Sequence, residues 1–244
     1  MKELEILPMK DANERHHKKK GLLFDLPMKV LVVGKSQLSG KTNFLGNILL
    51  RDDKRLYRNE FNGENIYLVS PSAGTDAKLK TIREELDIPN SNVFNDYNEE
   101  ELDNLYEIIK DNYNDAVANK EKPVHSLIIF DDMSASGLLK KNVNGVMSKI
   151  FCNGRHILLS VVITAQRYAD ILTTCRENTT GAVFFAGTER QLEHIADDMS
   201  HLPRNDFKKL FRDTTNEKHS FFVVNFSNAI GSGRYMNKKF KPIG

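Results

Sequence analysis

The chain has 244 residues with a formal net charge of +2, and hydrophobic residues make up 40% of it. This composition suffices for a sizeable core and excludes disorder of the whole chain. The longest nearly apolar run, from Ile157 to Ala165, is too short to span a bilayer, and no secretory signal opens the chain. Cys152 and Cys175 have neither zinc-site nor disulfide-framework spacing, so we expect a soluble protein of a reducing, intracellular compartment.

Charge is unevenly distributed along the chain. Residues 93–121 hold nine acidic side chains and two lysines, whereas residues 204–244 hold nine basic and three acidic side chains. A basic carboxyl-terminal stretch can contact phosphates, or it can simply form a solvated surface. The charge distribution alone therefore assigns no partner.

Alternating strand and helix patterns follow a charged arm, residues 1–20, which we expect to be mobile. Short β-branched and aromatic runs predict strands at 29–33, 66–69, 126–130, 157–163, 182–185 and 221–224. Amphipathic segments predict helices at 41–50, in the acidic stretch, and at 142–153, 169–175 and 189–199. In the acidic stretch the apolar residues recur at three- and four-residue steps, so its carboxylates are expected to face water rather than bind a metal.

This order of elements predicts an α/β fold. Continuous apolar strands that alternate with amphipathic helices are typical of a three-layer arrangement, in which helices cover both faces of a mostly parallel central sheet. No internal repeat or low-complexity linker divides the chain. We therefore expect residues 21–244 to form a single domain.

A phosphate-binding loop follows the first predicted strand and leads into a helix. Residues 34–42 read GKSQLSGKT. Glycine lets backbone N–H groups turn toward phosphates, Lys41 reaches the β- and γ-phosphates, and Thr42 offers its hydroxyl to Mg²⁺. The first glycine stands one place early, with Lys35 in the usual glycine position; the alternative is a glycine turn that binds nothing. The predicted nucleotide-binding residues are Gly34, Ser36, Gln37, Leu38, Ser39, Gly40, Lys41, Thr42 and Asn43.

Two acidic residues end the strand predicted at 126–130. In phosphate-loop NTPases an acidic residue at this point holds Mg²⁺, and Asp131 fits that role. A second acid, usually Glu, polarises the attacking water. Here that position is Asp132, one methylene shorter, and we predict that it is the general base. The alternative is that Asp132 only caps the segment 134–139.

The next predicted strand is preceded by Arg155 and followed by Gln166. A glutamine at the carboxyl end of a strand beside the acidic strand can contact both the γ-phosphate and the attacking water. An arginine at the opposite edge is too far from its own site, but it can reach a neighbouring subunit's nucleotide and stabilise transition-state charge. Taken singly, an arginine or a glutamine at these positions more often has a structural role. Together with the phosphate-binding loop and the paired acidic residues, Arg155 and Gln166 form a set typical of a nucleotide-hydrolysis site.

From Val30 to about Phe185 the order of these motifs resembles the FtsK–HerA superfamily of ring ATPases, and more narrowly the genome-packaging ATPases of poxviruses, tailless internal-membrane phages and virophages. The likeness is carried by the SGKT loop, residues 66–71 (IYLVSP), 129–132 (IFDD) and 154–156 (GRH), the strand with Gln166, and residues 171–178 (ILTTCREN). It implies a RecA-like P-loop NTPase fold with an additional strand. It also implies ATP hydrolysis, with ATP and Mg²⁺ as cofactors, coupled to moving double-stranded DNA into a preformed viral capsid.

The resemblance also implies residue roles and partners. Arg155 becomes an arginine finger acting in trans, Gln166 a sensor, and Arg176 a second candidate for an intersubunit contact. Expected partners are double-stranded DNA held without base specificity, further copies of the chain in a ring, expected to be a hexamer, and a capsid or membrane vertex protein. The expected location is the host cytoplasm, a viral factory or the virion. Candidate DNA-contacting residues are Lys140, Lys141, Arg234, Lys238 and Lys239.

Three other functions fit parts of the sequence. A nucleoside or metabolite kinase would share the phosphate loop, but the region after Gln166 has scattered arginines rather than a compact arginine-rich lid. A GTPase would need an Asn-Lys-x-Asp motif to recognise its base, and residues 237–240 lack the acid. A nucleotide-gated scaffold with little turnover is compatible with the departures at Lys35 and Asp132. DNA-stimulated hydrolysis would separate the motor from the kinase and the scaffold.

Overall fold

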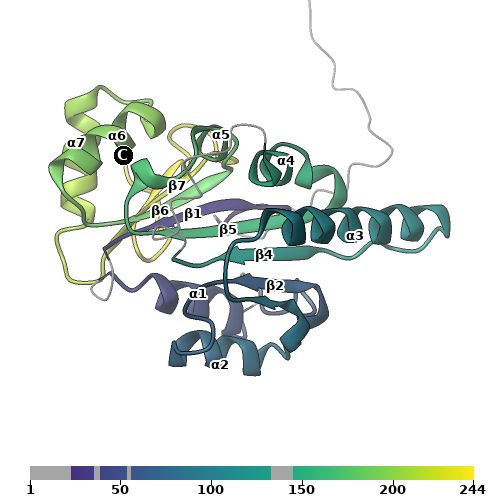
Figure 1. The fold of residues 1–244 in the computed structure, drawn as a ribbon. Helices are drawn as coiled ribbons and strands as arrows, with labels where there is room; N and C mark the ends of the chain where they lie inside the picture. The colour runs from purple at the N-terminus through teal and green to yellow at the C-terminus, as the bar shows by residue number, and fades with distance from the viewer. Residues whose placement is uncertain (1–22, 36–38, 54–55, 133–144) are drawn as a thin grey trace, which may run out of the picture.

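The computed structural model describes residues 23–35, 39–53, 56–132 and 145–244, which form one eight-stranded sheet with helices on both faces (Figure 1). The strand order is β3-β2-β4-β5-β1-β6-β7-β8. The strands are β1 (Lys29–Val33), β2 (Ile66–Val69), β3 (Val93–Phe94), β4 (Ser126–Phe130), β5 (Leu159–Ala165), β6 (Gly181–Phe185), β7 (Phe221–Asn225) and β8 (Tyr235–Met236). The strands from β3 to β6 in this order run parallel, and β7 and β8 add an antiparallel edge.

The helices form two layers, one on each face of the sheet (Figure 1). One layer holds α1 (Lys41–Leu50) and α2 (Ala77–Glu85); the other holds α3 (Glu99–Ala118), α4 (Val146–Asn153), α5 (Thr173–Glu177), α6 (Glu189–Met199) and α7 (Arg204–Thr214). Successive side chains of a strand point to opposite faces. In β1, Leu31 and Val33 accordingly join the core under α3 to α7, whereas Val30 and Val32 join the core under α1 and α2. The predicted three-layer α/β fold is confirmed.

The acidic stretch is the long helix α3, as predicted. The side-chain oxygen of Asn98 accepts hydrogen bonds from the backbone N–H groups of Glu100 and Glu101, and acidic residues in the first turn suit the positive end of the helix dipole. The buried residues of α3 are Leu102, Leu105, Tyr106 and Ile109. In the part of the chain that the structure describes, no helix combines the length and apolarity needed to cross a membrane.

Some element boundaries differ from the predictions. The strand predicted at 157–163 is shifted to β5, because Gly154–Ile157 forms a 3-10 turn and Leu158 has a left-handed φ of 55°. The helix predicted at 169–175 is a 3-10 turn, Tyr168–Asp170, followed by α5. The helix predicted at 142–153 agrees with α4, while residues 142–144 lie outside the described residues. Elements α2, β3, α7 and β8 were not predicted. The strands β3 and β8 have two residues each, which is too short for an alternation of apolar and polar residues to be recognised.

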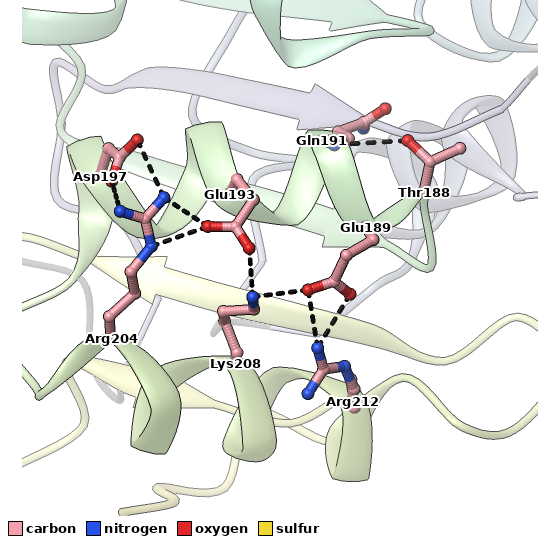
Figure 2. A network of polar contacts seen from close by, with 8 residues as sticks. All are labelled: Thr188, Glu189, Gln191, Glu193, Asp197, Arg204, Lys208 and Arg212. Atoms are coloured by element: carbon pink, nitrogen blue, oxygen red, sulfur yellow. Dashed lines mark hydrogen bonds and ion pairs between the residues drawn. The ribbon is translucent and has the colours of Figure 1, made fainter.

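A ladder of ion pairs joins α6 to α7, and it accounts for part of the basic carboxyl-terminal stretch (Figure 2). Acidic residues recur every four positions along α6, and basic residues recur every four positions along α7. The pairs are Asp197 with Arg204, Glu193 with Arg204 and Lys208, and Glu189 with Lys208 and Arg212. These three basic side chains therefore bind a neighbouring helix of their own chain.

We expect the α6–α7 ladder to make folding sensitive to acid. Hydrogen bonds from Arg212 and Lys208 lower the pKa of Glu189 from 4.5 to about 2. A depressed folded-state pKa contributes stability that is fully present above pH 4.5 and is lost as the pH falls toward 2. The difference in melting temperature between wild type and Glu189→Gln should therefore shrink on acidification. Glu84→Gln, an exposed change on α2, is the matched control, and a pH-independent difference for Glu189→Gln would contradict the prediction.

Candidate nucleotide-hydrolysis site

Three neighbouring strands at the centre of the sheet end at the same edge, where most of the predicted site residues lie. β1 pairs with β5, and β5 pairs with β4, all in parallel, so the loops after their carboxyl ends meet. A cavity of about 430 Å³ lies beside these loops. Its lining residues are Ser39, Gly40, Lys41, Thr42, Ser72, Asp76, Ala77, Lys78, Asp131 and Asp132. The structure thus brings the phosphate loop and both acidic residues to one cavity.

The two glycines of the phosphate loop are needed for different reasons. A Cβ on Gly34 would lie 2.6 Å from the Cβ of Ser39 and 2.9 Å from that of Phe185, so the two ends of the loop leave no room for a side chain. Gly40 caps α1 with a φ of 99°, a conformation that favours glycine. Close packing therefore explains the early glycine. Ser36, Gln37 and Leu38, three of the predicted nucleotide ligands, lie outside the described residues.

Lys41 opens α1 at the edge of the cavity. Its side chain is buried, and its Nζ donates a 2.8 Å hydrogen bond to the carbonyl oxygen of Gly34. Burial lowers the pKa of Lys41, and the charges of Asp132 and Asp131 oppose this shift. The ammonium group is therefore held near two carboxylates at the base of the phosphate loop, where it can bind phosphate oxygens.

A hydroxyl group of β5 orients both acidic residues. Thr164 Oγ1 donates a 2.7 Å hydrogen bond to Asp131 Oδ1 and accepts one of 3.0 Å from the backbone N–H of Asp132. Ser70, after β2, donates to Asp131 Oδ2 at 3.5 Å. Burial raises the pKa of Asp131, whereas the hydrogen bond from Thr164 lowers it. Thr164 thus sets the positions of two adjacent acids from a neighbouring strand.

Asp132 and Gln166 are in direct contact. Gln166 Nε2 donates to both carboxylate oxygens of Asp132, at 3.0 Å to Oδ1 and 3.2 Å to Oδ2. Asp132 also has a φ of 50°, a region uncommon for residues other than glycine. Such strain is concentrated at functional sites. The residues predicted as base and sensor are therefore neighbours, and their catalytic roles stay predictions. The alternative role of Asp132, capping the segment 134–139, concerns residues that lie outside the described ones.

We expect Thr164→Val to destabilise the protein. Valine keeps the shape of the side chain but removes the hydroxyl, leaving a backbone N–H and a carboxylate oxygen without this partner, and such a loss costs about 1–3 kcal/mol. Urea unfolding should show this drop in the free energy of unfolding for Thr164→Val. Thr164→Ser retains the hydroxyl and should change less. Equal stability of Thr164→Val and wild type would show that the hydroxyl does not bridge the two acids.

Thr42 and Asp131 fit the ligand set of Mg²⁺. Their hydroxyl and carboxylate groups line the same cavity, and Mg²⁺ commonly takes one or two protein oxygens together with waters and substrate phosphates. Within the described ranges, no cluster of three His, Cys, Asp or Glu side chains forms a metal site. Asp131 is buried with a raised pKa, and a nearby cation would favour its charged form.

Arg155 lies before the amino end of β5, whereas the phosphate loop follows the carboxyl end of the parallel strand β1, so the two lie at opposite ends of these strands. It is exposed in the 3-10 turn before β5, and its Nε donates a 3.3 Å hydrogen bond to His156 Nε2. Its charge acts on Lys29 at the start of β1, whose pKa is lowered first by burial and then by Arg155. Arg155 therefore lies away from its own phosphate loop, as a residue acting in trans must, and the trans role stays a prediction.

Arg176 is bound within its own chain. Its guanidinium group forms an ion pair with Asp198, donates to the carbonyl oxygen of Ile171 at 3.2 Å, and lies 5.0 Å from the centre of the Tyr168 ring. The Tyr168 hydroxyl donates a 2.8 Å hydrogen bond to the same Asp198 carboxylate. The Arg176 side chain is only 18% exposed. It thus ties α5 to α6, which leaves Arg155 as the stronger candidate for an intersubunit contact.

The predicted DNA-contacting residues have different surroundings. Lys140 and Lys141 lie outside the described residues. Arg234 donates to a backbone carbonyl oxygen at 3.0 Å and packs over an aromatic ring, and Lys238 forms an ion pair. Lys239 is exposed. A role in DNA binding stays a prediction for each of them.

Three groups of this site were not predicted from the sequence. Thr164 is one, and its signal is a hydroxyl at the end of an otherwise apolar run. The loop after β2 is another, because the sequence alone assigned Ser70 and Ser72 no role in the site. The third is the start of α2, where Asp76 caps the helix by accepting hydrogen bonds from backbone N–H groups at 2.8 and 3.1 Å. A capping residue before an amphipathic run was the available signal.

Solved structures establish the fold by comparison. The genome-packaging NTPase B204 of Sulfolobus turreted icosahedral virus 2, in complex with AMPPCP, matches with a TM-score of 0.56 at 15% identity, over 89% of this chain and 99% of that chain. The DNA-packaging ATPase B204 of Sulfolobus turreted icosahedral virus matches with a TM-score of 0.57 at 14% identity, over 90% of this chain and 99% of that chain. The pCW3 conjugation coupling protein TcpA gives 0.52 at 13% identity, over 84% of this chain and 59% of that chain. The predicted P-loop NTPase fold is confirmed, with β5 inserted between β1 and β4 as the additional strand.

The sequence itself identifies the family. Among curated proteins none matches the chain significantly. The sequence profile of the family described as poxvirus A32 protein, in contrast, matches residues 14–234. This match includes the phosphate loop, both acidic residues and the strands that position them. The chain therefore belongs to the poxvirus A32 protein family.

Proposed function

We propose that this chain is an ATP-hydrolysing motor that moves double-stranded viral DNA into a preformed capsid. Its membership of the poxvirus A32 protein family supports the proposal, as does its structural likeness to NTPases described as genome-packaging enzymes. The observation that carries the proposal is the contact between Gln166 and the Asp132 carboxylate beside the buried Lys41. A site that only bound nucleotide would need no carboxylate oriented in this way.

Residues from three strands divide the work of hydrolysis. The phosphate loop binds the phosphates, and Lys41 draws charge from the γ-phosphate. Thr42 and Asp131 would hold Mg²⁺, which would supply positive charge at the phosphate oxygens. Asp132 accepts a proton from the attacking water while Gln166 keeps its carboxylate oriented. Because Gln166 follows β5, it can relay the state of the γ-phosphate to the rest of that strand.

Arg155 completes the site of a neighbouring copy. In a ring with nucleotide between subunits, the far edge of one sheet faces the phosphate loop of the next. The guanidinium group then stabilises charge on the transferred phosphoryl group, a contribution of about 10³- to 10⁵-fold in other phosphate-loop enzymes. We propose that the ring is a hexamer and that the capsid or membrane vertex supplies its anchor.

The DNA contact is expected to be made through phosphates. A packaging motor must move any sequence, so its grip on the duplex should lack base specificity and weaken with salt. Such a motor works where virions assemble, in the host cytoplasm or in a viral factory, and can stay with the virion.

ATP hydrolysis with and without long double-stranded DNA, titrated over protein concentration, tests this function. A motor that assembles into a ring should give a rate that rises with DNA and more than linearly with protein concentration. The DNA stimulation should fall as salt increases. A rate that is indifferent to DNA and linear in protein would contradict the motor and favour a kinase or a nucleotide-gated scaffold.

A further inference from the structure

A second cavity, of about 290 Å³, adjoins the phosphate loop on the other flank of α1. It shares Ser39 and Gly40 with the phosphate-side cavity, so the two spaces meet at the loop. The first turns of α1 separate them: Lys41 and Thr42 line the phosphate side, whereas Phe44 lines the second cavity. The second cavity therefore lies next to the place where Lys41 would bind phosphates.

Aromatic rings from distant parts of the chain form the wall of this cavity. The ring of Phe44 lies 5.5 Å from that of Phe221 and 6.5 Å from that of Phe240, and the rings of Phe221 and Phe240 are 6.0 Å apart. Phe185 is the last residue of β6, and the centre of its ring lies 5.4 Å from that of Phe221. Clustered aromatic faces favour flat, polarisable ligands, and every nucleobase is one.

Two residues with left-handed backbones border the cavity. His219 has a φ of 61° and Phe240 a φ of 55°. His219 Nδ1 lies 3.8 Å from the position that a Cβ on Gly40 would take, so the imidazole is next to the phosphate loop. A bulky side chain such as that of Phe240 seldom adopts this conformation, whereas histidine adopts it more readily. Both turns place a ring at the same cavity.

Hydrogen bonds hold the turn that carries Phe240. The backbone N–H of Phe240 donates to the Asn237 carbonyl oxygen at 2.8 Å, and that of Asn237 donates to the Lys241 carbonyl oxygen at 3.0 Å. An ion pair between Lys238 and Glu217 joins this turn to the one that carries His219. The two turns are thus fixed to each other as well as to the cavity.

A third cavity, of about 300 Å³, also borders α1, but it lacks these features. It shares Thr42 with the phosphate-side cavity, and its other lining residues include Asn47, Leu50 and Ile82 without an aromatic ring. Without an aromatic residue in its lining, this cavity offers a base no aromatic stacking surface. The aromatic cavity is therefore the better continuation of a bound nucleotide.

We propose that the aromatic cavity binds the base and ribose of a purine nucleotide, with Phe240 as the stacking wall and His219 as a hydrogen-bonding group where the nucleoside meets the phosphates. Asn43 and Asn47, on the α1 side, supply further hydrogen-bonding groups. This assignment rests on the proposed function, because it requires nucleotide phosphates in the phosphate loop. It gives the carboxyl-terminal turns a role in nucleotide affinity.

Calorimetric titration with Mg-ATP and with inorganic tripolyphosphate separates the two halves of the site. Tripolyphosphate probes the phosphate side alone. Phe240→Ala should raise the Kd for ATP by about tenfold or more, the usual effect of removing one ring from under a base, and leave the Kd for tripolyphosphate unchanged. Phe240→Trp should retain ATP affinity. Phe226→Ala, an aromatic truncation elsewhere in the same carboxyl-terminal segment, is the control and should leave both values unchanged.

His219→Gly provides a variant whose folding is not at risk, because glycine adopts the left-handed conformation freely. Its Kd for ATP should rise several-fold while its melting temperature does not fall. Unchanged ATP affinity in Phe240→Ala and His219→Gly, or an equal loss for ATP and tripolyphosphate, would overturn the assignment and leave the proposed function standing. Failure of the wild type to bind either compound would instead overturn the nucleotide site itself.

Discussion

Lys41→Ala should abolish ATP hydrolysis while the protein stays folded. The Lys41 ammonium group is buried beside the phosphate loop, in the same cavity as Asp131 and Asp132, and the charges of these two carboxylates act on it. Removing one preorganised group that stabilises transition-state charge costs about 10²- to 10³-fold in rate. Phosphate release measured at saturating ATP should therefore fall at least about 100-fold.

Two controls show whether the lost hydrolysis reflects a loss of catalysis rather than a loss of folding. Lys78 also lines the cavity but lies on α2 and is exposed, so Lys78→Ala should retain most of the activity. The melting temperature of Lys41→Ala shows whether the variant is folded under the assay conditions, because the substitution also removes the hydrogen bond to the Gly34 carbonyl oxygen. Residual hydrolysis above about a tenth of wild type would contradict the role given to Lys41.

Arg155→Ala should collapse hydrolysis although its side chain lies at the far edge of the sheet from the phosphate loop. As an arginine finger it is expected to contribute about 10³-fold or more to the rate. Arg155→Lys should recover little, since lysine lacks the planar fork that binds two phosphate oxygens. Because Arg155 is exposed, stability should be unaffected, and binding of ATP should change far less than turnover.

Mixing the two inactive variants tests whether Arg155 acts in trans. In rings that contain Lys41→Ala and Arg155→Ala subunits in equal amounts, about one site in four combines an intact Lys41 with an intact Arg155 from its neighbour. Activity should therefore reappear on mixing. Arg176→Ala serves as the comparison, because the guanidinium group of Arg176 already pairs with Asp198 in the same chain. This variant should lower the stability of the protein rather than act on the site of a neighbouring subunit. Absence of any recovery in mixed rings would contradict a trans role for Arg155.

The residues that follow strands could be predicted from the sequence because local patterns place them. A buried run that stops at a glycine, and another that stops at paired acids, already fix the phosphate loop and Asp131 at one edge of a parallel sheet. Thr164 could not be assigned in this way. Its role depends on the register of β4 and β5, in which Phe130 lies opposite Ile163, and a single sequence does not report register.

The carboxyl-terminal part shows a second limit of sequence analysis. Its charge was counted as a total, whereas the four-residue spacing of acids in 189–197 and of bases in 204–212 was the informative signal. That spacing predicts two facing helices and would have revealed α7. The aromatic cavity is harder to predict, because Phe44 and Phe240 are far apart in sequence and meet only when β7 and the following turn close over α1.

Displacement of a triplex-forming oligonucleotide from linear double-stranded DNA tests the central claim most directly. A translocating motor removes the third strand when it passes, so displacement should require ATP, increase with time and be lost in Lys41→Ala and Arg155→Ala. It should be independent of the DNA sequence that lies between the entry end and the triplex. DNA-stimulated ATP hydrolysis without any displacement would contradict the claim and would make the protein a DNA-bound nucleotide switch.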